Sequence, residues 1–277
     1  MKQVFKYDWI MRKEAATPPG GKYAAPALDK GLDILEMLAD APHGMNLNGI
    51  AKALARTTSE IFRMVVTLQQ RGYLVVDAND RYKLTLKLLE LSHRQQPLKS
   101  LVATATPLMR ELAGRAYQSC HLTVYHDGQI LVVAQVDAPG PFSMGAKVGA
   151  LGKLTDSASG TMLLAFQDEA QRTRMIAAQI RVHGELETDA AQLLRQIEDA
   201  RARAAITWPS RRIRGATDVS RPVFGINQEV IAALTVPYIE RLDRHQSPSI
   251  PDVEALVGEI AGRLSELMCY TGHNTLQ

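Results

Sequence analysis

The chain has 277 residues, of which 46% are hydrophobic and 22% are charged, and its net charge is +3. This length suffices for one small and one medium domain. No apolar run is long enough to span a membrane, and the first 21 residues lack the apolar segment of a signal peptide. Cys120 and Cys269 show neither metal-ligand spacing nor a disulfide framework, so we expect no metal, no cofactor and a reducing cytoplasmic location.

Basic residues gather in one part of the sequence. Between Lys52 and Arg94 they outnumber acidic residues by eight to four. A surface that faces DNA has a local excess of this kind. A solvated helical face has it as well, so charge alone leaves both interpretations open.

The pattern of residues 24–85 predicts a winged helix-turn-helix domain. Residues 1–23 end in a Pro- and Gly-rich stretch, and we expect them to form a flexible arm. Helical spacing then appears in Leu28, Leu32, Leu35 and Leu38, over residues 47–55, and from Thr58 to Arg71. Two short strands over residues 73–77 and 81–85 follow as a hairpin. Three helices and a hairpin in this order are typical of DNA-binding winged helices.

Within this domain the second and third helices carry the DNA-binding prediction. Their close packing needs a small residue, a tight turn and a branched apolar residue, and Ala51, Ala55 and Ile61 fall at that spacing. The N-terminal residues of the third helix would face base edges in the major groove. The candidate DNA contacts are Thr57, Thr58, Ser59, Phe62 and Arg63 on this helix, and Arg81 and Lys83 on the hairpin. An ordinary helical hairpin, with Arg63 a solvated surface residue, is the alternative.

Thr57 and Glu60 have the spacing of a capping box. The Thr57 hydroxyl can accept from the amide of Glu60, and the Glu60 carboxylate can accept from the amide of Thr57. We therefore interpret Glu60 as a helix cap and not as a base reader.

The remaining residues predict a linker over 86–100 and an α+β domain over 101–273. Helices are predicted over residues 86–92, 98–117, 156–166, 190–204 and 251–270, and strands over 122–125, 130–136, 142–147, 217–223 and 230–236. Asp127 and Gly128 form the turn signal between the first two strands. Because hairpins replace strict βαβ units, we expect a largely antiparallel sheet flanked by helices.

These segments together resemble the IclR family of transcription regulators. The resemblance rests on residues 27–35, 57–74, 81–84, 158–165, 221–224 and 232–234, with Arg63 at the family's arginine position, and it covers about residues 24–272. It implies a GAF-like C-terminal domain that binds a small-molecule effector. It also implies a homodimer or a dimer of dimers whose binding to double-stranded operator DNA changes with the effector.

The resemblance places the effector between the sheet and the loop after Lys153. The candidate effector contacts are Met144, Ser157, Ala158, Ser159, Gly160, Trp208, Asp218, Thr235 and Pro237. Free backbone amides at a helix start attract carboxylates, which favours an organic acid of a catabolic pathway as the effector. The alternative is that Ser157 or Asp156 simply caps the helix. Met144 and Trp208 suit an apolar wall or the core.

Two departures from the family pattern bear on the effector. Asp218 stands where relatives carry a serine or cysteine, and residues 210–214 contain Arg211, Arg212 and Arg214 where relatives often have acidic residues. The arginines either hold an anionic effector or form a solvated loop.

The sequence also disfavours two other classes of protein. An enzyme is disfavoured because none of the common catalytic motifs is present, and because Cys120 and His121 would point to opposite faces of a strand. A sensor that acts only through protein contacts is disfavoured by the basic third helix.

Overall fold

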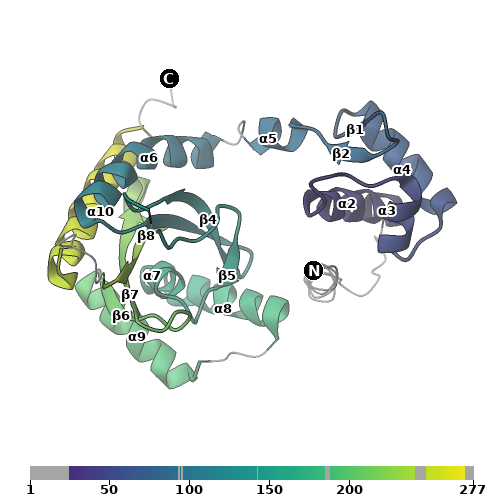
Figure 1. Cartoon of the computed structure of the whole chain (residues 1–277). Helices are drawn as coiled ribbons and strands as arrows, with labels where there is room; N and C mark the ends of the chain where they lie inside the picture. The colour runs from purple at the N-terminus through teal and green to yellow at the C-terminus, as the bar shows by residue number, and fades with distance from the viewer. Residues whose placement is uncertain are drawn as a thin grey trace. The chain divides into compact units, whose positions relative to one another are not determined.

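The computed structural model describes residues 25–92, 94, 96–141, 143–184, 188–240 and 248–271 (Figure 1). The chain divides into two compact units between Lys99 and Ser100. The predicted N-terminal arm, residues 1–23, lies outside the described residues. Each unit has its own core.

The first unit has the predicted order of three helices and a hairpin. Its elements are α2 (Pro26–Ala39), α3 (Leu47–Ala53), α4 (Thr58–Gln70), β1 (Leu74–Val76) and β2 (Tyr82–Leu84). The two strands pair antiparallel, and Met45 adds a bridge to Tyr82. Ile34, Ile50 and Ile61 are fully buried where the three helices meet. This confirms the predicted winged helix-turn-helix.

The turn between α3 and α4 also follows the prediction. Ala51 and Ile61 are buried in the core, while Ala55 lies in the turn. Ala55 has a φ of 51°, in the left-handed region, which is where the chain reverses between the two helices.

The predicted apolar face of α2 is partly wrong. Of the four leucines, Leu38 is buried, but Leu28 and Leu32 are 62% and 47% exposed. The buried face runs instead through Gly31, Ile34, Met37 and Leu38. Because α2 carries apolar residues on two faces, spacing alone did not reveal which face packs on α4 and β2.

Two helices occupy the predicted linker region and the residues after it. They are α5 (Lys87–Ser92) and α6 (Gln96–Ala116), and the second begins two residues before the predicted start. Leu86 and Leu89 are 78% and 52% exposed. An apolar surface of this kind on a short helix is available for contact with another surface.

The second unit is built on a six-stranded sheet. Its strands are β3 (Cys120–His126), β4 (Gln129–Val136), β5 (Leu151–Lys153), β6 (Ile206–Pro209), β7 (Ala216–Phe224) and β8 (Val230–Ile239). The order is β5-β4-β3-β8-β7-β6, and every neighbouring pair is antiparallel. Asp127 and Gly128 form the predicted turn, both with positive φ. The predicted antiparallel α+β domain is confirmed.

The strand predicted over residues 142–147 is wrong. Residues 143–147 have no regular structure, Phe142 lies outside the described residues, and β5 is the strand that pairs with β4. Gly149 has a φ of 84° and donates to the Val132 carbonyl, so the chain turns onto β4 only after residue 147. The short strand β6 was not predicted from the sequence, because pairing with β7 is what makes it a strand.

Helices cover both faces of this sheet. They are α7 (Ala158–Ala165), α8 (Glu169–His183), α9 (Ala190–Arg203) and α10 (Ile250–Thr271), with the 3-10 turn η1 (Ile226–Gln228) between β7 and β8. Figure 1 shows α7 inside the curve of the sheet, and α6 and α10 on the outer side. Helix α8 was not predicted, since only Met175, Ala178 and Gln179 of its residues are buried.

Helix α7 is the centre of the second unit, and all eight of its residues are buried. It packs on β7, β8 and α9. A Cβ atom built on Gly160 would lie 1.9 Å from the carbonyl oxygen of Leu154. Only glycine allows this contact between the helix and the end of β5.

Replacement of Gly160 by alanine tests this contact. We expect Gly160→Ala to lower stability by about 1–3 kcal/mol because the backbone of Leu154 must move. Gly262→Ala is the matched control, since Gly262 is helical and a Cβ there meets nothing within 4 Å, so the control is expected to melt no lower than wild type. Thermal unfolding measures both variants. Equal melting temperatures of Gly160→Ala and wild type would show that position 160 does not require glycine.

Candidate DNA-binding helix and effector site

The start of α4 is held by the predicted capping box. Thr57 Oγ1 accepts from the Glu60 amide at 3.3 Å, and Glu60 Oε2 accepts from the Thr57 amide at 2.9 Å. Lys30 Nζ lies 3.3 Å from Glu60 Oε1. The hydrogen bonds from Thr57, with the help of Lys30, lower the pKa of Glu60 to about 2. Glu60 is therefore a charged cap, as predicted.

Polar and apolar side chains share the exposed face beside this cap. Thr57, Ser59 and Arg63 are exposed, Thr58 is half-buried, and Phe62 is 50% exposed. Within residues 25–92 no ion pair or hydrogen bond engages the Arg63 guanidinium. The helix N-terminus thus presents hydroxyl groups, an aromatic ring and a cation that has no protein partner there.

Asp77 organises the hairpin. Its Oδ1 atom accepts from the amides of Asn79 and Arg81 at 2.9 and 3.1 Å, and its Oδ2 atom lies 2.8 Å from Lys83 Nζ. The bond to Lys83, then those to the two amides, lowers the pKa of Asp77 to about 2. Arg81 is exposed, whereas Lys83 is already paired with Asp77. Sequence analysis did not single out Asp77, although an aspartate two residues before a turn is a known signal.

Two cavities lie away from the predicted effector residues. One of about 200 Å³ is lined by Gly44, Met45, Asn46, Gly49 and Arg81, and one of about 330 Å³ by Phe224, Gly225, Gln228, Ser265, Glu266 and Cys269.

At the start of α7, Ser157 is the cap. Its Oγ atom accepts from the Gly160 amide at 3.1 Å and donates to the Lys153 carbonyl at 2.9 Å. The expectation that all amides here are free is wrong for Gly160, because the local hydroxyl reaches that amide first. Within the described residues the amides of Ala158 and Ser159 have no acceptor, as is usual in the first turn of a helix.

The hydroxyl of Ser159 faces the sheet. It lies 3.0 Å from the Thr235 hydroxyl on β8, which in turn lies 2.8 Å from the Ser220 hydroxyl on β7. All three residues are buried. Thr235 therefore anchors α7 on the sheet, and both of its neighbours satisfy its hydroxyl.

Three further predicted residues form one row across the sheet. Trp208 pairs with Asp218, and Asp218 pairs with Pro237, so the three side chains share the face covered by α7. Trp208 and Asp218 are half-buried, and Pro237 is buried. Burial raises the pKa of Asp218, while a hydrogen bond from Ser210 and the charge of Arg212 oppose the rise. Met144 is half-buried in the irregular segment after β4.

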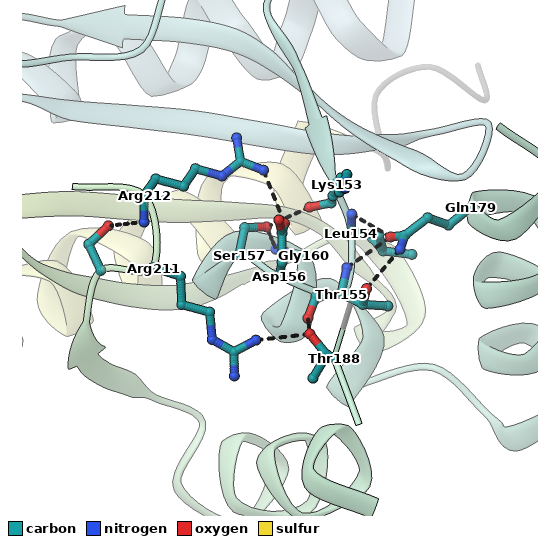
Figure 2. A network of polar contacts seen from close by, with 11 residues as sticks. Lys153, Leu154, Thr155, Asp156, Ser157, Gly160, Gln179, Thr188, Arg211 and Arg212 are labelled. Atoms are coloured by element: carbon teal, nitrogen blue, oxygen red, sulfur yellow. Dashed lines mark hydrogen bonds and ion pairs between the residues drawn. The ribbon is translucent and has the colours of Figure 1, made fainter. Parts of the chain in front are cut away.

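The loop between β6 and β7 is fastened across the start of α7 (Figure 2). Arg212 Nη2 lies 3.0 Å from Asp156 Oδ1, and Arg211 Nη1 donates to Thr188 Oγ1 at 3.0 Å. The Arg211 guanidinium also lies over the Trp208 ring, 5.8 Å from its centroid. These two arginines are thus held by specific partners, while Arg214 is exposed.

A buried glutamine supports the segment that Arg211 and Arg212 cover. Gln179 Oε1 accepts from the amides of Leu154 and Thr155 at 2.7 and 2.9 Å, and its Nε2 atom donates to Thr155 Oγ1 at 2.7 Å (Figure 2). Thr188 donates to the Thr155 carbonyl at 3.4 Å. Sequence analysis missed Gln179, because its partners lie on a segment distant in sequence.

The described residues give little support to a catalytic thiol, a metal site or a membrane span. Cys120 is buried, which raises the pKa of its thiol to about 12, so it is a poor nucleophile at neutral pH. In the part of the chain that the structure describes, no three His, Cys, Asp or Glu side chains gather as a metal site would require. None of the described helices is long and apolar enough to cross a membrane.

A winged helix-turn-helix joined to this antiparallel domain defines a DNA-binding transcription regulator with a sensory domain. Residues 27–78 match the IclR helix-turn-helix domain, and residues 97–265 match the domain described as bacterial transcriptional regulator IclR C-terminal. The chain belongs to the IclR family. It is a regulator whose DNA binding responds to a small-molecule effector, and it is not an enzyme.

Individual relatives cover most of the chain. The glycerol operon regulatory protein of Streptomyces coelicolor is 26% identical over 247 residues, which is 86% of this chain and 94% of that protein. The regulator KdgR of Escherichia coli is 23% identical, over 87% and 92% of the two chains. An IclR homologue of Microbacterium hydrocarbonoxydans, solved with 4-hydroxybenzoate, has a TM-score of 0.72 at 22% identity, over 87% and 98%.

Proposed function

We propose that the protein binds double-stranded operator DNA as a homodimer or a dimer of dimers, and that an organic acid of a catabolic pathway modulates this binding. The observation that carries the DNA part is the capped, exposed N-terminus of α4 with an unpaired Arg63. Thr57, Thr58, Ser59 and Phe62 lie beside it, and Arg81 on the hairpin supplies a phosphate contact. Lys83 on the same hairpin is a further candidate DNA contact, and its Nζ atom is ion-paired with Asp77.

Arg63 is the residue expected to read a base. Arg63→Ala should weaken binding to the DNA upstream of the protein's own gene by about 1–3 kcal/mol and relax sequence preference. The matched control Arg201→Ala removes an exposed arginine of the second unit and should leave affinity unchanged. Gel shifts at several salt concentrations measure both, because binding should fall steeply with salt. Equal affinity of Arg63→Ala and wild type would contradict this assignment.

Exposed leucines support the assembly. Leu28 and Leu32 on α2, with Leu86 and Leu89 at α5, leave apolar side chains uncovered within one chain. One recognition helix reads only a half-site, so a specific regulator needs two-fold pairing. We infer that these leucines contribute to the contact between protomers.

Light scattering tests the assembly. Wild type should have at least the mass of a dimer at micromolar concentration, and replacing Leu86 and Leu89 together by glutamate should shift it toward the monomer. Leu194→Glu is the control, because Leu194 of α9 is as exposed as Leu89, and this variant should keep the wild-type mass. A monomeric wild type, with or without DNA, would rule out the proposed dimer.

Arg212 and the free amides of α7 support an acidic effector. Arg212 reaches Asp156 at the helix start, and its charge also acts on Asp218. A carboxylate near the amides of Ala158 and Ser159 can replace Asp156 as the partner of Arg212. That the homologue from Microbacterium hydrocarbonoxydans was solved with 4-hydroxybenzoate agrees with an organic acid.

A calorimetric series checks the acidic effector. Mono- and dicarboxylic acids, including aromatic ones, are titrated into wild type, Arg212→Gln and the control Arg214→Gln, whose arginine is exposed. We expect Arg212→Gln to weaken binding of the best acid about tenfold or more, because a charge-assisted hydrogen bond is lost. Ser159→Trp should block binding. If only a neutral or cationic metabolite binds, the acid is the wrong class.

A further inference from the structure

A row of side chains crosses four strands on the face of the sheet that α7 covers. His121 on β3 pairs with Thr235 on β8 and, on its other side, with Gln135 on β4. Thr235 pairs in turn with Ser220. Because Thr235 bonds to Ser159 of α7, His121 and Gln135 lie on the same face as the predicted effector residues.

Among the residues that the structure describes, two polar atoms in this row are buried without a hydrogen-bond partner. They are His121 Nδ1 and Gln135 Oε1, which belong to directly opposite residues. The hydroxyls of Thr235 and Ser220, by contrast, are bonded to each other. A buried polar atom without a hydrogen bond destabilises the protein unless something supplies one.

The orientation of the Gln135 amide follows from its other contacts. Its Nε2 atom donates to the Val136 carbonyl and to Asp137 Oδ1, both at 3.3 Å. Exchanging the nitrogen and the oxygen would set an oxygen against these two acceptors. Gln135 Oε1 can therefore only accept a hydrogen bond.

The surroundings link this pair to the effector site. A Cβ built on Gly145 would lie 1.8 Å from Gln135 Nε2, so the segment that contains Met144 lies directly on Gln135. Burial and the charge of Arg212 lower the pKa of His121 to about 4, which leaves the imidazole neutral at neutral pH. His121 and Gln135 thus lie between Thr235 and the segment that contains Met144.

The chemistry of the missing partner is restricted. A carboxylate has no hydrogen to donate to Gln135 Oε1, and a cationic amine is disfavoured by the charge of Arg212. A hydroxyl group donates to Gln135 Oε1 and also bonds to a neutral imidazole. We propose that His121 and Gln135 bind a hydroxyl group of the effector. This inference rests on the proposed function, and with an acid held by Arg212 it makes the effector a hydroxylated organic acid.

Matched pairs of compounds test the assignment in the full-length protein. Calorimetry compares 4-hydroxybenzoate with benzoate, 3-hydroxybutyrate with butyrate, and glycerol with 1,3-propanediol. In each pair the first compound has one more hydroxyl group than the second, and in wild type the first member of the pair that fits the site should bind about tenfold or more tightly. Gln135→Met and His121→Phe should each reduce this ratio to about one without weakening the other member of the pair.

Gln118 supplies the matched control. It is a buried glutamine whose Nε2 atom donates to the Ile239 carbonyl at 2.9 Å and whose Oε1 atom accepts from the Ile239 amide at 3.1 Å. Gln118→Met should keep the discrimination between paired compounds, yet melt lower than Gln135→Met in the absence of ligand. This comparison separates a structural glutamine from one that binds a ligand.

The outcomes separate this inference from the proposal on which it rests. Equal binding of both members of every pair to wild type, or discrimination that survives in Gln135→Met and His121→Phe, would overturn the hydroxyl site alone. If glycerol binds and no acid does, with discrimination lost in Gln135→Met, the hydroxyl site holds and the organic acid fails. If no compound binds wild type, both are overturned.

Discussion

The contact between Gly160 and the Leu154 carbonyl is the constraint on which the effector domain depends. It sets α7 directly against the end of β5, where no side chain larger than hydrogen fits. With the helix at this depth, Ser157 reaches back to the Lys153 carbonyl and Ser159 reaches Thr235 on β8. The helix start, the sheet and the β5 segment therefore form one unit, and a ligand that shifts any of them affects the others.

The polar groups around α7 divide into those that build the domain and those that remain available. The hydroxyls of Ser159, Ser220 and Thr235 are hydrogen-bonded to one another inside the core. The side chain of Gln179 is hydrogen-bonded to the segment before α7. Arg212 pairs with Asp156 on the surface, where water weakens the attraction, so a ligand carboxylate can compete for it. His121 is half-buried, and its Nδ1 atom is buried with no partner among the described residues. The Thr235 hydroxyl thus already has two partners inside the domain, whereas Arg212 has one partner at the surface.

In the DNA-binding domain, too, some charged groups are bonded within the domain and others remain available on its surface. Glu60 and Asp77 are acidic residues within a basic region. Each accepts local hydrogen bonds, which order the helix start in the case of Glu60 and the hairpin tip in the case of Asp77. Both carboxylates therefore stay charged and help to fix the shape of this surface. Arg63 and Arg81 stay exposed on that surface, which leaves the net positive character facing solvent.

Features that depend on neighbours in the chain were determined by the sequence alone. The capping box of Thr57, the turn at Asp127 and Gly128 and the order of most helices and strands need only residues a few positions apart. Strand β6, the irregular segment before β5 and the buried face of α2 were decided by packing and pairing with distant segments. The same holds for the row that joins Gln135, His121 and Thr235, because strand register is set by the whole sheet, and a shift of one residue would turn each side chain to the opposite face.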